Sequence, residues 1–318
     1  LIGLSSLTVA AKNHSIVNGL VSHIEQRNDV DSEVPCVMII ALVEGRYKVS
    51  IPFDEFYQKN PIDMATVNME TKAGREEYVN RCATMAAKLY SLNVPMVITT
   101  IQVDESTDAE AGVPAYVIVA SRKAALDIIE EANYGDRPDG DGPRIQEGDF
   151  VRAQITSVAR DSIAVVVGGV DTRVSLHALT FEYLVDARTK YKVGQEIMVQ
   201  VEQIIKEKDG HHIVEVNCKQ PELERAKQMR SALPIGSIVF GIVSSVAASK
   251  KQPGNINVLA YIKMYDLPVL VNNMPAKFLG SEPPRGSTVR LKVLNYLDNG
   301  MILCRCIGTQ GPMNFPNT

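Results

Sequence analysis

Long apolar runs are missing from this chain. No stretch of its 318 residues approaches the roughly 18 apolar residues that a helix needs to cross a bilayer. The N-terminal stretch, residues 1–15, lacks a basic start and contains only a short apolar run, so we expect no signal peptide. Together these absences predict a protein without a membrane partner.

Cysteine is scarce and unpaired. The chain has five cysteines, an odd number, and only Cys304 and Cys306 lie close together in the sequence. A lone C-x-C is a poor zinc candidate, and two thiols on one short strand are too constrained for a relaxed disulfide. His211 and His212 are adjacent, and neighbours on a strand face opposite ways, so they are a poor pair for one metal. We therefore predict five free thiols, a reducing cytoplasmic location, no metal site and no cofactor.

Catalytic signatures are absent as well. There is no G-x-S-x-G turn, no P-loop, and no cysteine–histidine pair with a local signature. The acidic pairs Asp104–Glu105 and Glu130–Glu131 are sequence neighbours and are typical of solvated side chains rather than of acid/base couples. We expect a binding or structural protein that is not an enzyme.

An excess of basic charge is also missing. The net charge is −4, whereas a dedicated nucleic-acid-binding domain is usually basic. Any RNA-binding surface must therefore be a local patch on an acidic body.

The sequence does contain short alternating strands. In the middle of the chain Val151, Ala153 and Ile155 alternate with polar residues, which is the pattern of a half-buried strand. Four further segments of this kind follow at short spacing. Five such strands predict a small Greek-key barrel, and they occupy residues 147–159, 162–169, 170–180, 192–204 and 211–219.

The same order of segments recurs on both sides of this unit. It returns clearly after a short helix that follows residue 219, and more loosely near the N-terminus, where a helix is inserted. In that inserted helix Tyr78, Cys82, Met85 and Leu89 lie on one stripe. We therefore predict a mainly β protein of three tandem five-stranded OB-fold barrels joined by short helices, the first with a helical insertion.

The predicted boundaries follow from this repeat. The stretch 135–144, GDRPDGDGPR, should stay solvated, because glycine and proline fix turns and the aspartates remain hydrated. The predicted segments are a degenerate first barrel at 1–128 with its insertion at about 60–93, a linker at 129–146, a middle barrel at 147–219, a helical linker at 220–232, a third barrel at 233–308 and a tail at 309–318.

Three strings of the middle segment resemble a known family. EGDFVRAQITSV, GGVDTRVSLHALT and KVGQEIMVQVEQI are similar to the G-D-x-V-x-x-x-V, G-x-V-x-G-x-V-H-x-S-E-L and V-G-x-x-V-x-V-x-V strings of the S1 domain. This is the RNA-binding OB-fold domain named after ribosomal protein S1 of the bacterial small subunit. The resemblance runs from about residue 16 to 307 and implies tandem barrels that bind RNA.

The resemblance also implies where bases would stack. The family places exposed aromatic residues on strands two and three, and a histidine near the end of strand three. In the middle segment these positions fall at Asp161, Ala164 and Ser175, with His177 two residues further on. The basic residue that often opens the last strand of the family falls near His212. The stacking platform of the middle barrel is therefore largely missing.

Aromatic and basic residues alternate instead in the last segment. The string NVLAYIKMY puts Tyr261, Lys263 and Tyr265 on one strand face. Rings on such a face can stack bases while the cations contact phosphates, which suits single-stranded RNA. The alternative interpretation is a solvated barrel face whose tyrosines cover the edges of the core. The predicted nucleic-acid-binding residues are Tyr261, Lys263, Tyr265, Arg290, Lys292, Arg305 and the loop residues Lys250 and Lys251 in the third barrel, with Arg152, Arg173, His177 and His212 in the middle barrel.

Two functions from different classes fit this pattern. The first is single-stranded RNA binding through OB-fold faces, in translation or in a ribonucleoprotein, with the ribosome or another protein assembly as a further partner. The second is a structural or interaction component of a large assembly, for example a phage particle, that uses the barrels for protein contacts; its expected location is then within a virion and not the cytoplasm. A basic surface confined to one barrel would favour the first.

Overall fold

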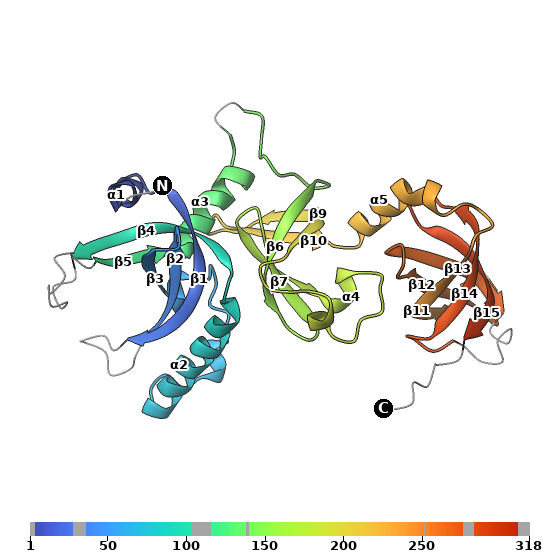
Figure 1. Cartoon of the computed structure of the whole chain (residues 1–318), viewed down its shortest axis with the longest axis horizontal. Helices are drawn as coiled ribbons and strands as arrows, with labels where there is room; N and C mark the ends of the chain where they lie inside the picture. Colours follow the sequence, from blue (N-terminus) through green and yellow to red (C-terminus); the bar gives the residue numbers. More distant parts are fainter. Residues whose placement is uncertain are drawn as a thin grey trace.

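The computed structural model describes residues 4–27, 36–103, 116–137, 140–250, 252–275 and 283–310. Three five-stranded sheets follow one another along the long axis of the molecule (Figure 1). The strands are β1 (Ile16–Arg27), β2 (Cys36–Val43), β3 (Tyr47–Pro52), β4 (Asn93–Val103), β5 (Tyr116–Ser121), β6 (Phe150–Val158), β7 (Ser162–Val167), β8 (Val170–Ser175), β9 (Glu196–Lys206), β10 (His212–Asn217), β11 (Ile238–Ala248), β12 (Asn255–Ile262), β13 (Leu267–Pro275), β14 (Thr288–Tyr296) and β15 (Ile302–Gln310).

The three sheets share one strand order. The first and third are closed barrels with the orders β1-β2-β3-β5-β4 and β11-β12-β13-β15-β14. The middle sheet, β10-β9-β6-β7-β8, has the same order opened between β8 and β10, where the Thr172 hydroxyl donates to the Val214 carbonyl at 2.8 Å. We call the three units the first, middle and third barrels. The predicted fold class, mainly β with three five-stranded units, is confirmed.

The alternation of buried and outward-facing residues explains why these segments form strands. In β7, Ile163, Val165 and Val167 are buried, while the residues between them are half-buried and face outward. Each barrel encloses its own cluster of buried apolar side chains, so each has a separate core. This is the arrangement that tandem domains require.

Short helices accompany the barrels. They are α1 (Leu4–Lys12), α2 (Lys72–Ala86), α3 (Arg122–Tyr134), α4 (Leu176–Leu179) and α5 (Gln220–Gln228), with single 3₁₀ turns at Phe53–Glu55, Met64–Thr66, Ala87–Leu89, Ala187–Thr189 and Met229–Ala232. Within the described ranges no helix is both long and apolar enough to span a bilayer. The insertion of the first barrel contains α2, and its predicted stripe is confirmed, because Cys82 and Leu89 are buried and Tyr78 and Met85 pack against the first core.

Two helices join the barrels, α3 between the first and middle barrels and α5 between the middle and third (Figure 1). Each packs on a glycine turn of the barrel that follows it. Gly169 has a φ of +100°, and a Cβ there would lie 2.4 Å from the Glu130 backbone nitrogen. Gly300 has a φ of +93°, and a Cβ there would lie 2.3 Å from the Leu223 carbonyl oxygen. Only glycine allows both the positive φ and this close approach.

The boundary predicted at residue 128 falls inside α3. The helix continues to Tyr134, because Glu130 and Tyr134 are buried and the Tyr134 hydroxyl donates to the Val167 carbonyl of the middle barrel at 3.0 Å. Residues 138 and 139 of the predicted solvated stretch lie outside the described residues. Its C-terminal end is anchored, since the Arg144 amide donates to the Asn133 carbonyl at 2.9 Å.

All five cysteines are free, and only Cys36 is exposed. Burial raises the pKa of the Cys218 and Cys304 thiols to about 12 and also raises the pKa of Cys82 and Cys306. Because the thiolate is the reactive form, we expect a thiol reagent at pH 8 to modify one cysteine quickly and the other four only after urea is added. The Cys36→Ser variant should lose the fast phase alone. Two fast thiols, or fewer than five after unfolding, would contradict this expectation.

Candidate nucleic-acid interface

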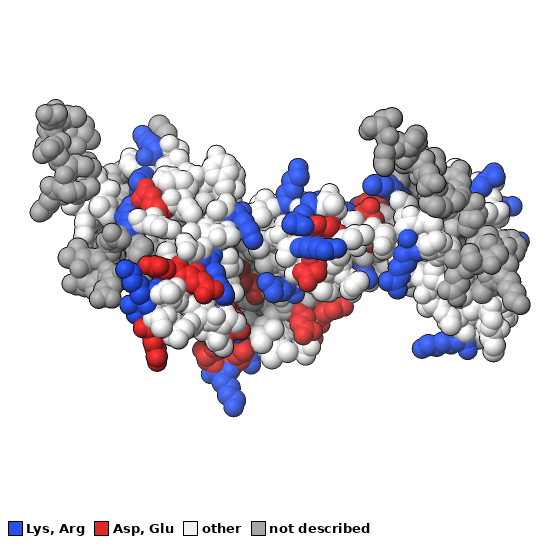
Figure 2. All heavy atoms as spheres, turned by 90° about the horizontal axis from the view of Figure 1, so that it is seen from below, with Lys and Arg blue, Asp and Glu red and all other residues white. Residues whose placement is uncertain are grey.

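The third barrel is the basic part of the chain. Residues 233–310 contain eight lysines and arginines against three aspartates and glutamates, although the whole chain has a net charge of −4. On the face that Figure 2 shows, acidic and basic side chains mix over the first and middle barrels, while the visible basic side chains of the third barrel stand among uncharged ones. Positive charge is thus concentrated in one domain, as a local RNA-binding patch requires.

Three cations of the third barrel share one outward face with two apolar side chains. Directly opposed residues on neighbouring strands bring their Cβ atoms within about 4.5–5.5 Å of each other. All the side chains concerned are exposed, with the two apolar ones about half exposed. The opposed pairs are Phe240–Arg290 and Ile238–Lys292 between β11 and β14, and Lys292–Arg305 between β14 and β15. We call these five residues the basic face.

The chemistry of the basic face suits a single nucleic-acid strand. Among the described residues, Glu182 of the middle barrel lies beside Lys263, while Arg290, Lys292 and Arg305 form no ion pair. These cations are therefore available to contact phosphates, which releases counterions from the nucleic acid. The exposed ring of Phe240 offers a surface on which a base can stack, a contact worth about 1–3 kcal/mol.

Tyr261, Lys263 and Tyr265 do not form the strand face that their alternation predicts. β12 ends at Ile262, and the chain then turns through residues 263–266, where Asp266 has a φ of 56°. Tyr261 is 1% exposed, its hydroxyl donates to Asp266 Oδ1 at 2.6 Å, and burial raises its pKa. A base cannot stack on a buried ring, so this prediction is wrong.

Tyr261 belongs instead to the joint between the middle and third barrels. The Lys190 Nζ of the middle barrel lies 5.5 Å from the centre of its ring and 3.9 Å from Asp266 Oδ1. Asp266 also pairs with Arg225 of α5. Burial alone would raise the pKa of Asp266, but the hydrogen bond from Tyr261 and the charges of Lys190 and Arg225 lower it. Lys190 over the ring and Asp266 at the hydroxyl therefore hold Tyr261 in this joint.

The other predicted residues of the third barrel are scattered. The Lys263 Nζ lies 3.9 Å from Glu182 Oε1 of the middle barrel, so it borders the same joint. Tyr265 is half-buried against the third core, and Lys250 is exposed. Lys251 lies outside the described residues. Of the third-barrel prediction, the structure brings together the three cations of the basic face.

Two of the predicted residues of the middle barrel, Arg173 and His212, line one cavity, and the other two lie outside it. Arg152 is exposed and pairs with Glu196 at 3.4 Å, while Arg173 and His177 are exposed on and beside β8. His212 is 7% exposed, and its Nδ1 lies 2.9 Å from Glu130 Oε1. α3 covers the start of β10, so His212 does not lie on an open strand face and instead lines a cavity between the first and middle barrels.

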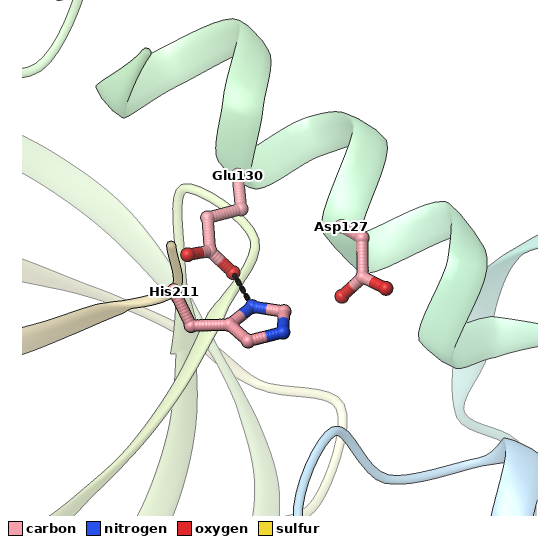
Figure 3. A group of neighbouring side chains, drawn as sticks. All are labelled: Asp127, Glu130 and His211. Carbon is pink, nitrogen blue, oxygen red and sulfur yellow. Dashed lines mark hydrogen bonds and ion pairs between the residues drawn. The ribbon is translucent and has the colours of Figure 1, made fainter. Parts of the chain in front are cut away.

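Glu130 of α3 contacts both His211 and His212. His211 Nδ1 lies 3.3 Å from Glu130 Oε2, the His212 amide donates to Oε1 at 2.6 Å, and Gln58 Nε2 donates to Oε2 at 2.9 Å. Strand alternation does not separate the histidines, because β10 begins only at His212. Asp127, Glu130 and His211 could hold a metal ion, since their ligand atoms lie within 4.8 Å of one another (Figure 3). Hydrogen bonds already satisfy Glu130, so we assign the cluster to the joint between the first and middle barrels.

Ile238 and Phe240 are not among the residues predicted from the sequence. A signal for them exists, because β11 alternates them with the buried Val239 and with Gly241, which places two large apolar side chains on the solvent side. What the sequence does not contain is the register that sets Arg290 opposite Phe240.

Comparisons with known proteins identify the middle unit. The family model of the S1 RNA binding domain matches residues 144–212. No curated protein matches this chain.

Solved structures give only distant likenesses. The a/eIF2alpha–aDim2p–rRNA complex from Pyrococcus horikoshii OT3 is 16% identical with a TM-score of 0.21; the likeness covers 26% of this chain and 56% of that one, little more than half its length. A multidomain protein with nucleic acid binding domains from Streptococcus pneumoniae TIGR4 is 12% identical with a TM-score of 0.22 and coverages of 92% and 73%. A murine DNA binding protein bound with double-stranded DNA is 13% identical with a TM-score of 0.17 and coverages of 49% and 93%.

Likenesses this weak carry no functional argument, whereas the family match coincides with the sheet β6–β10 and with the strings that resemble the S1 domain. The middle barrel thus matches the S1 RNA binding domain, and it is set between two further five-stranded barrels of the same strand order.

Proposed function

We propose that this protein binds single-stranded RNA and that the basic face of the third barrel is its main contact surface. The observation that carries the proposal is the register that sets Phe240 and Ile238 beside three cations without ion pairs. The S1 domain in the middle of the chain supports RNA as the ligand. Such a protein would hold unstructured RNA, in translation or in another ribonucleoprotein.

Stacking favours a single strand over a duplex. In a duplex the bases are already stacked on each other, so a ring such as Phe240 can gain a contact only with a splayed base. Cations alone would bind any phosphate backbone. Phe240 therefore distinguishes the two kinds of nucleic acid.

The test is binding of a labelled, unstructured RNA to the intact chain, measured by fluorescence anisotropy. We expect Phe240→Ala to cost about 1–3 kcal/mol of binding free energy without changing the salt dependence, because it removes stacking and no phosphate contact. The control is Phe150→Ala, which removes a phenylalanine of the middle barrel that is 44% exposed. No binding at low salt would refute the proposal, and an effect of the control variant alone would move the site to the middle barrel.

A second function has one observation in its favour. Phe150 and Met198 are both 44% exposed on neighbouring strands of the middle barrel, next to the ion-paired Arg152. Exposed apolar side chains rimmed by charge are typical of protein contacts. If the chain binds no RNA, we propose the role of an assembly component that uses this surface.

A further inference from the structure

A cavity of about 240 Å³ lies between the first and middle barrels. Its floor comes from β6, β7, β8 and the start of β10, which is the strand face of the S1 domain. Its opposite wall comes from residues 57–59, Pro61 and Met85 of the first barrel, and Glu130 of α3 lines it as well. OB-fold barrels bind oligonucleotides on the face of their second and third strands, here β7 and β8. The first barrel therefore stands over the face on which a strand would otherwise lie.

The floor is open because its central side chain is small. Ser157, Ala164 and Arg173 lie opposite one another on β6, β7 and β8 and form one row across the sheet. Ala164 stands at a position where the resemblance to S1 domains implies a stacking ring. Its methyl group leaves the space above the row empty. Arg173, which is exposed at the end of the row, places a positive charge at the rim.

The first barrel supplies the ring and a second cation. Tyr57 lines the cavity, and its ring is fixed by Phe53 and Phe56, with ring centres 5.3 and 5.0 Å away. Burial raises the pKa of Tyr57 to about 12, so its hydroxyl stays neutral at physiological pH. Lys59 pairs with Glu207 at 2.7 Å, but its side chain is 71% exposed, and such a pair exchanges readily for a phosphate.

Hydrogen bonds across the joint fix the two walls relative to each other. Gln58 of the first barrel donates to Glu130 of α3 at 2.9 Å and accepts from the Asp171 amide of β8 at 3.1 Å. The buried Arg122 donates to the Phe56 carbonyl at 2.7 Å and lies 3.6 Å from the Asp171 carboxylate. A cavity whose walls are fixed before binding loses little entropy when a ligand enters.

We propose that this composite cavity binds one nucleotide, with the base between the Tyr57 wall and Ala164 and the phosphate at Arg173 and Lys59. The wall of the first barrel prevents a strand from continuing across the face, so the occupant is a strand end, a single unstacked nucleotide or a free nucleotide. This inference rests on the proposed RNA-binding function and adds a second, selective site to the basic face.

The test is calorimetric titration of the intact chain with each of the four ribonucleoside 5′-monophosphates. We expect at least one to bind, and Ala164→Met to abolish its binding by filling the cavity. Arg173→Ala should weaken binding about fivefold at 0.1 M salt, the effect of one phosphate contact. Arg160→Ala, which removes an exposed arginine of the same barrel outside the cavity, should leave the affinity unchanged. Arg173→Ala alters an exposed side chain and remains decisive if Ala164→Met fails to fold.

The outcomes separate this inference from the proposed function. If no monophosphate binds, or if both cavity variants bind it as the wild type does, the cavity is not a nucleotide site, whatever the RNA affinity. RNA binding that depends only on the basic face would then stand alone. Monophosphate binding without any affinity for an unstructured RNA would support the cavity as a site for free nucleotides and refute the proposed function.

Discussion

Replacing Tyr261 by alanine is expected to destabilise the third barrel by about 3–5 kcal/mol, the cost of removing a large buried ring. The ring is 1% exposed and lies between β12, the Lys190 side chain and α5. Its removal leaves a cavity at the joint and takes a hydrogen-bond donor from Asp266. The measurement is urea denaturation of the intact chain, with the reactivity of Cys304 and Cys306 as local probes, because both thiols are buried in the third core.

Tyr261→Phe is the matched control. It keeps the ring and removes the hydroxyl that donates to Asp266, so we expect a smaller loss of about 1.5–3 kcal/mol, the range for a hydrogen bond to a charged group. The opposite result would be an alanine variant that unfolds at the same urea concentration as the wild type and yet binds RNA more weakly. Tyr261 would then act as the exposed stacking residue that its alternation predicts.

The strands could be predicted from the sequence because their signals are local. Alternation in β7 and the positive-φ glycines at the turns act over a few residues, and the same order of signals recurs three times. The stripe of α2 was predictable for the same reason. Local signals also placed Arg290, Lys292 and Arg305 on exposed strand positions, where the structure finds them.

The joints could not be predicted, because they depend on contacts between distant residues. His212 and Glu130 are 82 positions apart, and Tyr261 and Glu222 are 39 apart. Alternation indicates which side chains point outward from a barrel, but it does not show that a helix or a second barrel covers that side. Alternation therefore predicts an open face for Tyr261 that the joint covers, and it does not predict the contact of His212 with Glu130. The place of Phe240 beside Arg290 is not predicted either, because the register between β11 and β14 is equally non-local.

The largest functional effect is expected from the cations of the basic face. Replacing Arg290, Lys292 and Arg305 together by alanine should remove three phosphate contacts. On a single strand each contact contributes about 0.7 to the slope of log K against log salt, so the slope should flatten by about 2. Over the tenfold range from 1 M down to 0.1 M salt this corresponds to a loss of affinity of about a hundredfold at the lower concentration. Anisotropy titrations of an unstructured RNA at several salt concentrations measure both quantities.

A control of equal charge makes the result specific. Lys12, Lys72 and Lys88 are exposed lysines of the first barrel, and replacing them by alanine changes the net charge by the same three units. If affinity depended only on the overall charge of this acidic chain, both triple variants would weaken binding equally, because long-range fields do not distinguish the barrels. If the phosphates lie on the basic face, the control should keep nearly the wild-type slope. Equal slopes for the two variants would therefore remove the basic face as the binding surface, even if the protein binds RNA.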